Sequence, residues 1–156
     1  MRKAYDHGAD REARESMALG SMLAGLALAS ARLGLVHGVA HPLGALYGLA
    51  HGEACALLLP HVMEFNAGVV ERKFAILARA LGLTSTPNDT EATYKLIVWT
   101  RELCAGLGCL RDFRGFGLRR EDYPAIVEAA LASGSTKSNP RKVTEADVVR
   151  LLDRAR

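Results

Sequence analysis

The 156-residue chain has few cysteines, and their arrangement fits neither a disulfide framework nor a zinc ribbon. Cys55, Cys104 and Cys109 are odd in number, not densely spaced and without a CxxC pair. This pattern predicts free thiols in a reducing compartment. The first residues also lack the apolar segment of a secretory signal. We therefore expect a cytoplasmic protein.

Long apolar runs and a strong charge imbalance are missing as well. The most apolar stretch, 17–31, is shorter than the roughly 18–20 residues that a membrane span needs, and Gly20 and Gly25 dilute it. We expect it to be a buried helix. The net charge of +3 is too small to indicate nucleic acid or a membrane as partner. With 49% apolar and 24% charged residues, the composition is that of a folded globular domain.

Helical periodicity runs through most of the chain, and no convincing strand alternation interrupts it. Asp10, Thr90 and Thr144 are expected to cap helices, and Asn66 to Gly68 to end one. Pro42 is expected to kink or start a helix, and Pro60 to perturb the helix over 53–65. The spacing predicts a helix that follows Asp10 and runs to Ala31, helices over 35–46, 53–65, 70–81, 90–107 and 120–132, and one after Thr144. Glycines predict an irregular connection at 106–117, and a loop is expected at 134–140. The sequence thus predicts a single all-α domain over 1–156 with six or seven helices.

Three histidines fall within fifteen residues of one another. His37 and His41 are four residues apart, so on a helix they face the same side. His51 follows a glycine-bounded turn, 48–52, that can fold back toward them. Neutral imidazole is the commonest ligand of divalent metals in proteins. A single histidine on an apolar face is more often a hydrogen-bonded core residue, so both interpretations stay open on spacing alone.

Two other chemistries are disfavoured by missing residues. The His37–His41 spacing is that of the HExxH metalloprotease motif, but Gly38 stands where that motif needs its glutamate base. Neither GxGxxG nor GxxxxGK[ST] occurs after a predicted strand, so no phosphate-binding loop is expected.

The residues around the histidines carry a family resemblance. Segments 34–44 (GLVHGVAHPLG), 51–52 (HG) and 58–66 (LLPHVMEFN) are similar to the second signature of the iron-containing (group III) alcohol dehydrogenases. The similarity extends upstream through 10–29 and downstream through 139–141 (NPR) and the last helix. It implies a helical bundle like the C-terminal metal-binding domain of the dehydroquinate synthase-like fold. In that family a separate N-terminal α/β domain, which we expect to be absent here, binds NAD(P).

The resemblance also implies roles for individual residues. Family members hold one divalent metal, iron and in some cases zinc, with one aspartate and three histidines. His37 and His51 match the last two ligands, His41 matches a histidine beside the nicotinamide and substrate, and His61 matches a structural position. The first two ligands belong to a DxxxH segment that the chain lacks. One departure is Cys55, where the family commonly has asparagine.

In the intact family the metal acts as a Lewis acid, and an alcohol is interconverted with an aldehyde or ketone by hydride transfer with NAD(P). The expected substrate is therefore a small alcohol or aldehyde, and we expect the chain alone to be inactive. An alternative is a non-catalytic metal-binding or assembly module that pairs with a separately encoded nucleotide-binding domain, or forms a homo-oligomer. A free-standing metal protein would need further ligands, for which Glu53, Cys55 and His61 are candidates.

Overall fold

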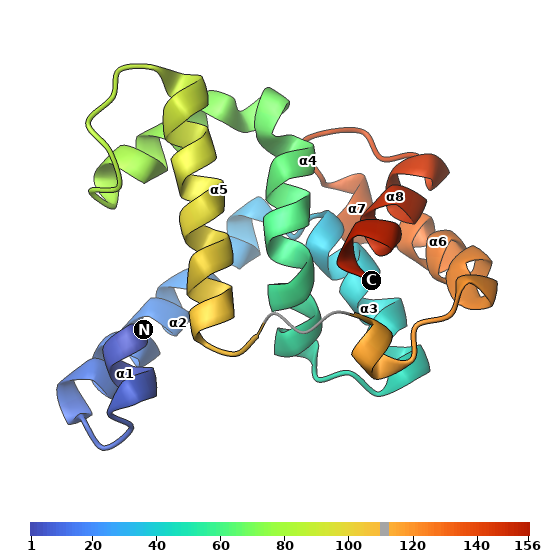
Figure 1. The fold of residues 1–156 in the computed structure, drawn as a ribbon, viewed down its shortest axis with the longest axis horizontal. Coiled ribbons are helices and arrows are strands. Elements are labelled where there is room, and N and C mark those ends of the chain that lie inside the picture. The colour runs from blue at the N-terminus through green and yellow to red at the C-terminus, as the bar shows by residue number, and fades with distance from the viewer. Residues whose placement is uncertain (110–112) are drawn as a thin grey trace. The chain divides into compact units, whose positions relative to one another are not determined.

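The computed structural model describes residues 1–109 and 113–156, and these residues form helices and turns without any strand (Figure 1). The predicted all-α class is therefore confirmed. The elements are α1 (Arg2–Asp6), α2 (Arg11–Ala31), α3 (Leu35–Tyr47), α4 (His51–Ala80), α5 (Asp89–Gly106), η1 (Phe113–Phe116), η2 (Arg120–Asp122), α6 (Tyr123–Ala132), α7 (Gly134–Lys137) and α8 (Glu145–Ala155). By contacts the chain divides into two compact units, Met1–Leu33 and Gly34–Arg156.

The first unit consists of α1 and α2. Asp10 caps α2 as predicted, since its carboxylate accepts the Ala13 N–H at 2.9 Å. The predicted burial of α2 is wrong, because none of its residues is buried and Leu26 is 62% exposed. Within its unit, α2 has only the five-residue α1 to pack against. Among the described residues, none of the helices alone has the length and apolar composition of a membrane span. Only α2 and α3 taken together, as two helices separated by a short break, reach that length and composition.

The second unit is built around α4. This 30-residue helix packs against α5 on one side and against α3 and α8 on others, while α6 and α7 complete the layer over α3 (Figure 1). A smaller core joins the second half of α4 to α5 through alanines and Leu96. The main core is formed by fully buried aliphatic side chains from α3, α4, α6 and α8, namely Leu35, Val39, Leu43, Leu58, Ile126, Val148 and Leu152.

Helix α4 replaces two predicted helices, 53–65 and 70–81, with one. Pro60 removes a backbone donor, but it is among the fully buried side chains, and its packing offsets that loss. Asn66 does not end the helix, because its amide is buried and paired with Asn139. Gly68 has open space where a side chain would be and is tolerated in the helix. Tertiary packing therefore overrides these local breaking signals.

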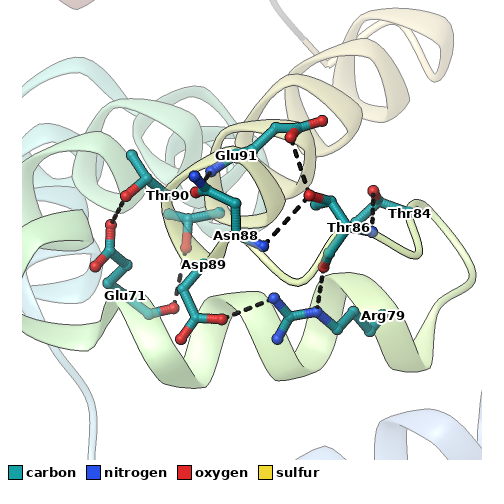
Figure 2. A network of polar contacts seen from close by, with 9 residues as sticks. Glu71, Arg79, Thr84, Thr86, Asn88, Asp89, Thr90 and Glu91 are labelled. Atoms are coloured by element: carbon teal, nitrogen blue, oxygen red, sulfur yellow. Dashed lines mark hydrogen bonds and ion pairs between the residues drawn. The ribbon is translucent and has the colours of Figure 1, made fainter.

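The connection from α4 to α5 is ordered by a polar network (Figure 2). The predicted cap Thr90 is instead the second residue of α5, and Asn88 caps the helix by accepting the Glu91 N–H at 2.9 Å. The Thr90 hydroxyl donates to Glu71 on α4 at 2.7 Å. Arg79 pairs with Asp89 at 2.7 Å and so ties the end of α4 to the start of α5.

The C-terminal helices follow the prediction more closely. Thr144 caps α8, and Asp147 completes a capping box with the Thr144 backbone. The predicted loop at 134–140 contains the single turn α7, and the predicted start of helix 120–132 is the 3-10 turn η2. The expected irregular connection at 106–117 includes 110–112, which lie outside the described residues.

Candidate metal centre

Two helices and the turn between them bring the three predicted histidines together. His37 and His41 lie one turn apart on α3, and His51 is the first residue of α4. The ring centroids are separated by 5.1 Å for His37 and His51, 5.4 Å for His41 and His51, and 6.1 Å for His37 and His41. The structure therefore brings the first half of α3 and the first residue of α4 together, so that the three imidazole rings form one cluster.

The turn that returns the chain to His51 depends on Gly48. This residue has φ of 65°, in the left-handed region that glycine adopts without strain, and its N–H closes α3 on the Gly44 carbonyl at 3.0 Å. Leu49 is buried and anchors the turn to the core. Helix α4 then begins two residues later at His51, which places that side chain beside α3.

Potential metal-ligating atoms of three residues lie close together. Among the described residues, His37, His51 and Cys55 each offer a donor atom, and these atoms lie within 4.8 Å of one another. Cys55 Sγ is 3.6 Å from His51 Nε2. Neither Glu53 nor His61 belongs to this group, and His61 is ten residues further along α4, roughly 15 Å along the helix axis.

The environment of the group favours neutral imidazole. Burial lowers the pKa of His37 below its usual range, and the neighbouring His51 and His41 lower it further. A neutral ring keeps a lone pair available for a cation, whereas a protonated ring does not. Burial also raises the pKa of the Cys55 thiol. His41 and His51 are exposed, so the cluster opens toward solvent.

An amide pair that the sequence did not predict anchors the helix carrying His37. Asn66 on α4 and Asn139, after α7, exchange two side-chain hydrogen bonds of 3.0 and 2.8 Å. The Asn139 oxygen also accepts the Leu35 N–H at the start of α3, at 3.2 Å. Arg141 lies over the Phe65 ring, 4.1 Å from its centroid, and donates to the Phe65 carbonyl. The segment after α7 thereby fixes the start of α3 against α4.

A separate cleft of about 330 Å³ lies along α4 and α8. Acidic and basic side chains both line this cleft. Glu64, one of the acidic residues, forms ion pairs with Arg101 and Arg154. Burial lowers the pKa of His61, while Glu64 opposes that shift. The residues lining the cleft are Leu35, His61, Glu64, Phe65, Arg141, Asp147, Arg150, Leu151 and Arg154. His61 thus lines this cleft and is not part of the histidine–cysteine group.

Acidification is expected to destabilise the chain in part through His61. Because the folded pKa of His61 lies below its unfolded value near 6.5, the unfolded state binds more protons and stability falls as pH drops below 6.5. Urea unfolding at neutral and mildly acidic pH should give a smaller pH dependence for His61→Gln than for wild type. The exposed His7 provides the control, since His7→Gln should leave that dependence unchanged. An identical dependence in all three proteins would contradict the prediction.

Comparison with known proteins extends over the whole chain. The model of the Fe-containing alcohol dehydrogenase family, C-terminal, matches residues 1–156. The chain is 42% identical to the lactaldehyde reductase of Escherichia coli (strain K12) over 147 residues, which are 94% of this chain and 38% of that protein. It is 39% identical to the 1,3-propanediol dehydrogenase of Klebsiella pneumoniae over 156 residues, 99% of this chain and 40% of that protein.

Solved structures agree with the sequence matches. A crystal structure of 1,3-propanediol oxidoreductase superimposes with a TM-score of 0.95 at 38% identity, covering 99% of this chain and 41% of that one. An alcohol dehydrogenase from Oenococcus oeni gives 0.92 at 37% identity, with coverage of 99% and 41%. The chain thus spans about two fifths of the length of the relatives it matches. It belongs to the Fe-containing alcohol dehydrogenase family and corresponds to its C-terminal, all-helical part.

Proposed function

We propose that this chain is the metal-binding part of an NAD(P)-dependent alcohol dehydrogenase that interconverts a small alcohol with its aldehyde or ketone. The observation that carries the proposal is the convergence of His37, near the start of α3, and His51, the first residue of α4, with ring centroids 5.1 Å apart. The lowered pKa of His37 supports the proposal, because a neutral imidazole can donate to a metal. Relatives named as lactaldehyde reductase and 1,3-propanediol dehydrogenase support the small-alcohol substrate class.

In the proposed site, His37 and His51 hold a divalent metal, iron or zinc. When bound, such an ion supplies Lewis-acid polarisation of the alcohol oxygen. His41 lies on the same face of α3, is exposed, and has its ring stacked on His51. We assign His41 to the wall of the reaction pocket, where it contacts the nicotinamide and carries a proton between the alcohol and solvent.

The proposed reaction also requires a nucleotide-binding partner domain. Hydride transfer needs the nicotinamide held against the alcohol, and the described residues contain no strand on which a dinucleotide-binding fold could be built. We expect that partner domain, or a further copy of the chain in a homo-oligomer, to cover the surface where His41 and His51 are exposed. The match of the C-terminal family model to 1–156 supports treating the chain as one helical metal-binding domain, which we expect to work in the cytoplasm.

A chimera tests this function directly. The part of Escherichia coli lactaldehyde reductase that precedes the matched segment would be joined to this chain, which replaces the matched segment. We expect the chimera to reduce NAD(P)⁺ when given a small diol and iron or zinc, and the 156-residue chain alone to show no turnover.

Histidine variants make the chimera informative. His37→Ala and His51→Ala should each abolish turnover together with metal retention, whereas His41→Ala should lower turnover while the metal stays bound. The exposed His7→Ala is the matched control and should change neither property. A folded, metal-loaded chimera without turnover would contradict the enzymatic role and favour a non-catalytic assembly module. Turnover by the chain alone would contradict its dependence on a partner.

A further inference from the structure

We propose that Cys55 is a third metal donor in this chain, so that its thiolate joins His37 and His51 in a site that takes zinc. This inference rests on the proposed metal-binding role of the two histidines and extends it to a different kind of ligand. Its starting observation is that the donor atoms of these three residues lie within 4.8 Å of one another.

The helix register places Cys55 beside His51. The two residues are four apart in the first two turns of α4, so their side chains emerge from the same face. His37 approaches that face from α3, with its ring centroid 5.1 Å from that of His51. Cys55 therefore completes a triangle whose corners come from two helices that pack together in the core.

The distance between the Cys55 sulfur and the His51 ring nitrogen fits coordination of one ion. Zinc–sulfur and zinc–nitrogen bonds of about 2.3 and 2.0–2.1 Å at a tetrahedral angle put sulfur and nitrogen about 3.6 Å apart. Cys55 Sγ and His51 Nε2 are 3.6 Å apart. The pair can thus share an ion with little movement of either side chain, and the same spacing holds a weak thiol–imidazole contact when no ion is bound.

The donor set selects the kind of metal. Two imidazoles and one thiolate suit zinc, whereas carboxylate and carbonyl oxygens suit magnesium or calcium. Three protein ligands leave a fourth tetrahedral position open for water or an alcohol oxygen, which is the pattern of catalytic zinc sites. Binding replaces the thiol proton, which passes to solvent, so no oxidant or reductant is required.

Among the described residues, the other two cysteines are not grouped with potential metal ligands as Cys55 is. All three thiols are free, and Cys104 is buried in α5. Cys109 Sγ lies 3.6 Å from the Leu107 carbonyl oxygen, a backbone contact two residues away. Neither belongs to the group of mutually close donors found among the described residues. Cys109 is half-buried like Cys55 and therefore offers a matched control.

Cobalt(II) titration of the 156-residue chain tests the proposal, because a thiolate ligand gives a near-ultraviolet sulfur-to-cobalt charge-transfer band that nitrogen and oxygen ligands do not give. We expect wild type and Cys109→Ser to bind one cobalt per chain with this band. Cys55→Ser should bind cobalt without the band, and its zinc affinity should fall at least about tenfold. Circular dichroism would establish that each variant is folded.

The outcomes separate this inference from the proposed function. If wild type binds cobalt without the band, and Cys55→Ser retains the wild-type zinc affinity, the thiolate ligand is overturned while the histidine pair stands. If neither wild type nor Cys55→Ser binds cobalt or zinc, both proposals fail. Loss of all binding in folded His51→Ala, together with loss of the band in Cys55→Ser, supports both.

Discussion

Replacing Gly38 with alanine should lower the free energy of unfolding by about 1–2 kcal/mol. A Cβ at this position would overlap the Thr136 hydroxyl oxygen and would lie 3.2 Å from Thr136 Cβ and 3.4 Å from its backbone nitrogen. Rotation of the Thr136 side chain can remove only the first clash, so α3 and α7 must separate. Overpacking of this kind costs about 1–3 kcal/mol, and the better helix propensity of alanine returns up to about 1 kcal/mol.

Denaturant unfolding of a double-mutant cycle measures this contact. Thr136→Ala alone should change stability by no more than about 1 kcal/mol, because the hydroxyl it removes is buried without a hydrogen-bond partner. In the Thr136→Ala background, Gly38→Ala should cost less than in wild type. Gly68→Ala is the control in open space on α4 and should be neutral or stabilising. An equal cost of Gly38→Ala in both backgrounds would refute the close contact between α3 and α7.

Replacing Asn139 with alanine, which breaks the Asn66–Asn139 pair, should also lower the free energy of unfolding. Asn139→Ala removes both side-chain hydrogen bonds of the buried Asn66 amide and leaves the Leu35 N–H at the start of α3 without its acceptor. Buried polar groups that lose their partners cost about 1–3 kcal/mol, and we expect a total loss of about 2–4 kcal/mol. Since α3 carries His37, the variant should also weaken metal binding.

Chemical denaturation of both single variants and the double variant tests the pair. Asn66→Ala/Asn139→Ala should be more stable than the sum of the single losses, because it leaves no unpaired amide behind. Asn88→Ala, at the exposed cap of α5, is the matched substitution and should cost only about 1 kcal/mol. Simple additivity of Asn66→Ala and Asn139→Ala would contradict the reciprocal hydrogen bonds.

Local sequence signals predicted the features that depend on neighbouring residues. The caps at Asp10 and Thr144 were confirmed because a capping side chain acts on its own first turn. The approach of the three histidines was also predictable, since the i, i+4 spacing and a glycine turn between short segments leave few alternatives. The assignment of His37 and His51 as ligands came from the family resemblance and stays a prediction.

Features that depend on distant contacts could not be read from local signals. Asn66 looked like a helix stop because its partner, Asn139, is 73 residues away in the chain. Pro60 looked like a perturbation of its helix because its burial is not visible in the neighbouring sequence. The exposure of α2 could not be predicted either. Its apolar composition indicated burial, but an apolar helix is buried only where another surface covers it.

Calorimetric titration of zinc into the purified chain tests the central claim most directly, with His37→Ala/His51→Ala as the comparison. We expect wild type to bind one zinc ion per chain and to release protons on binding, and the double variant to remain folded without binding. Equal zinc binding by wild type and the double variant, or none by either, would contradict a metal centre built on His37 and His51.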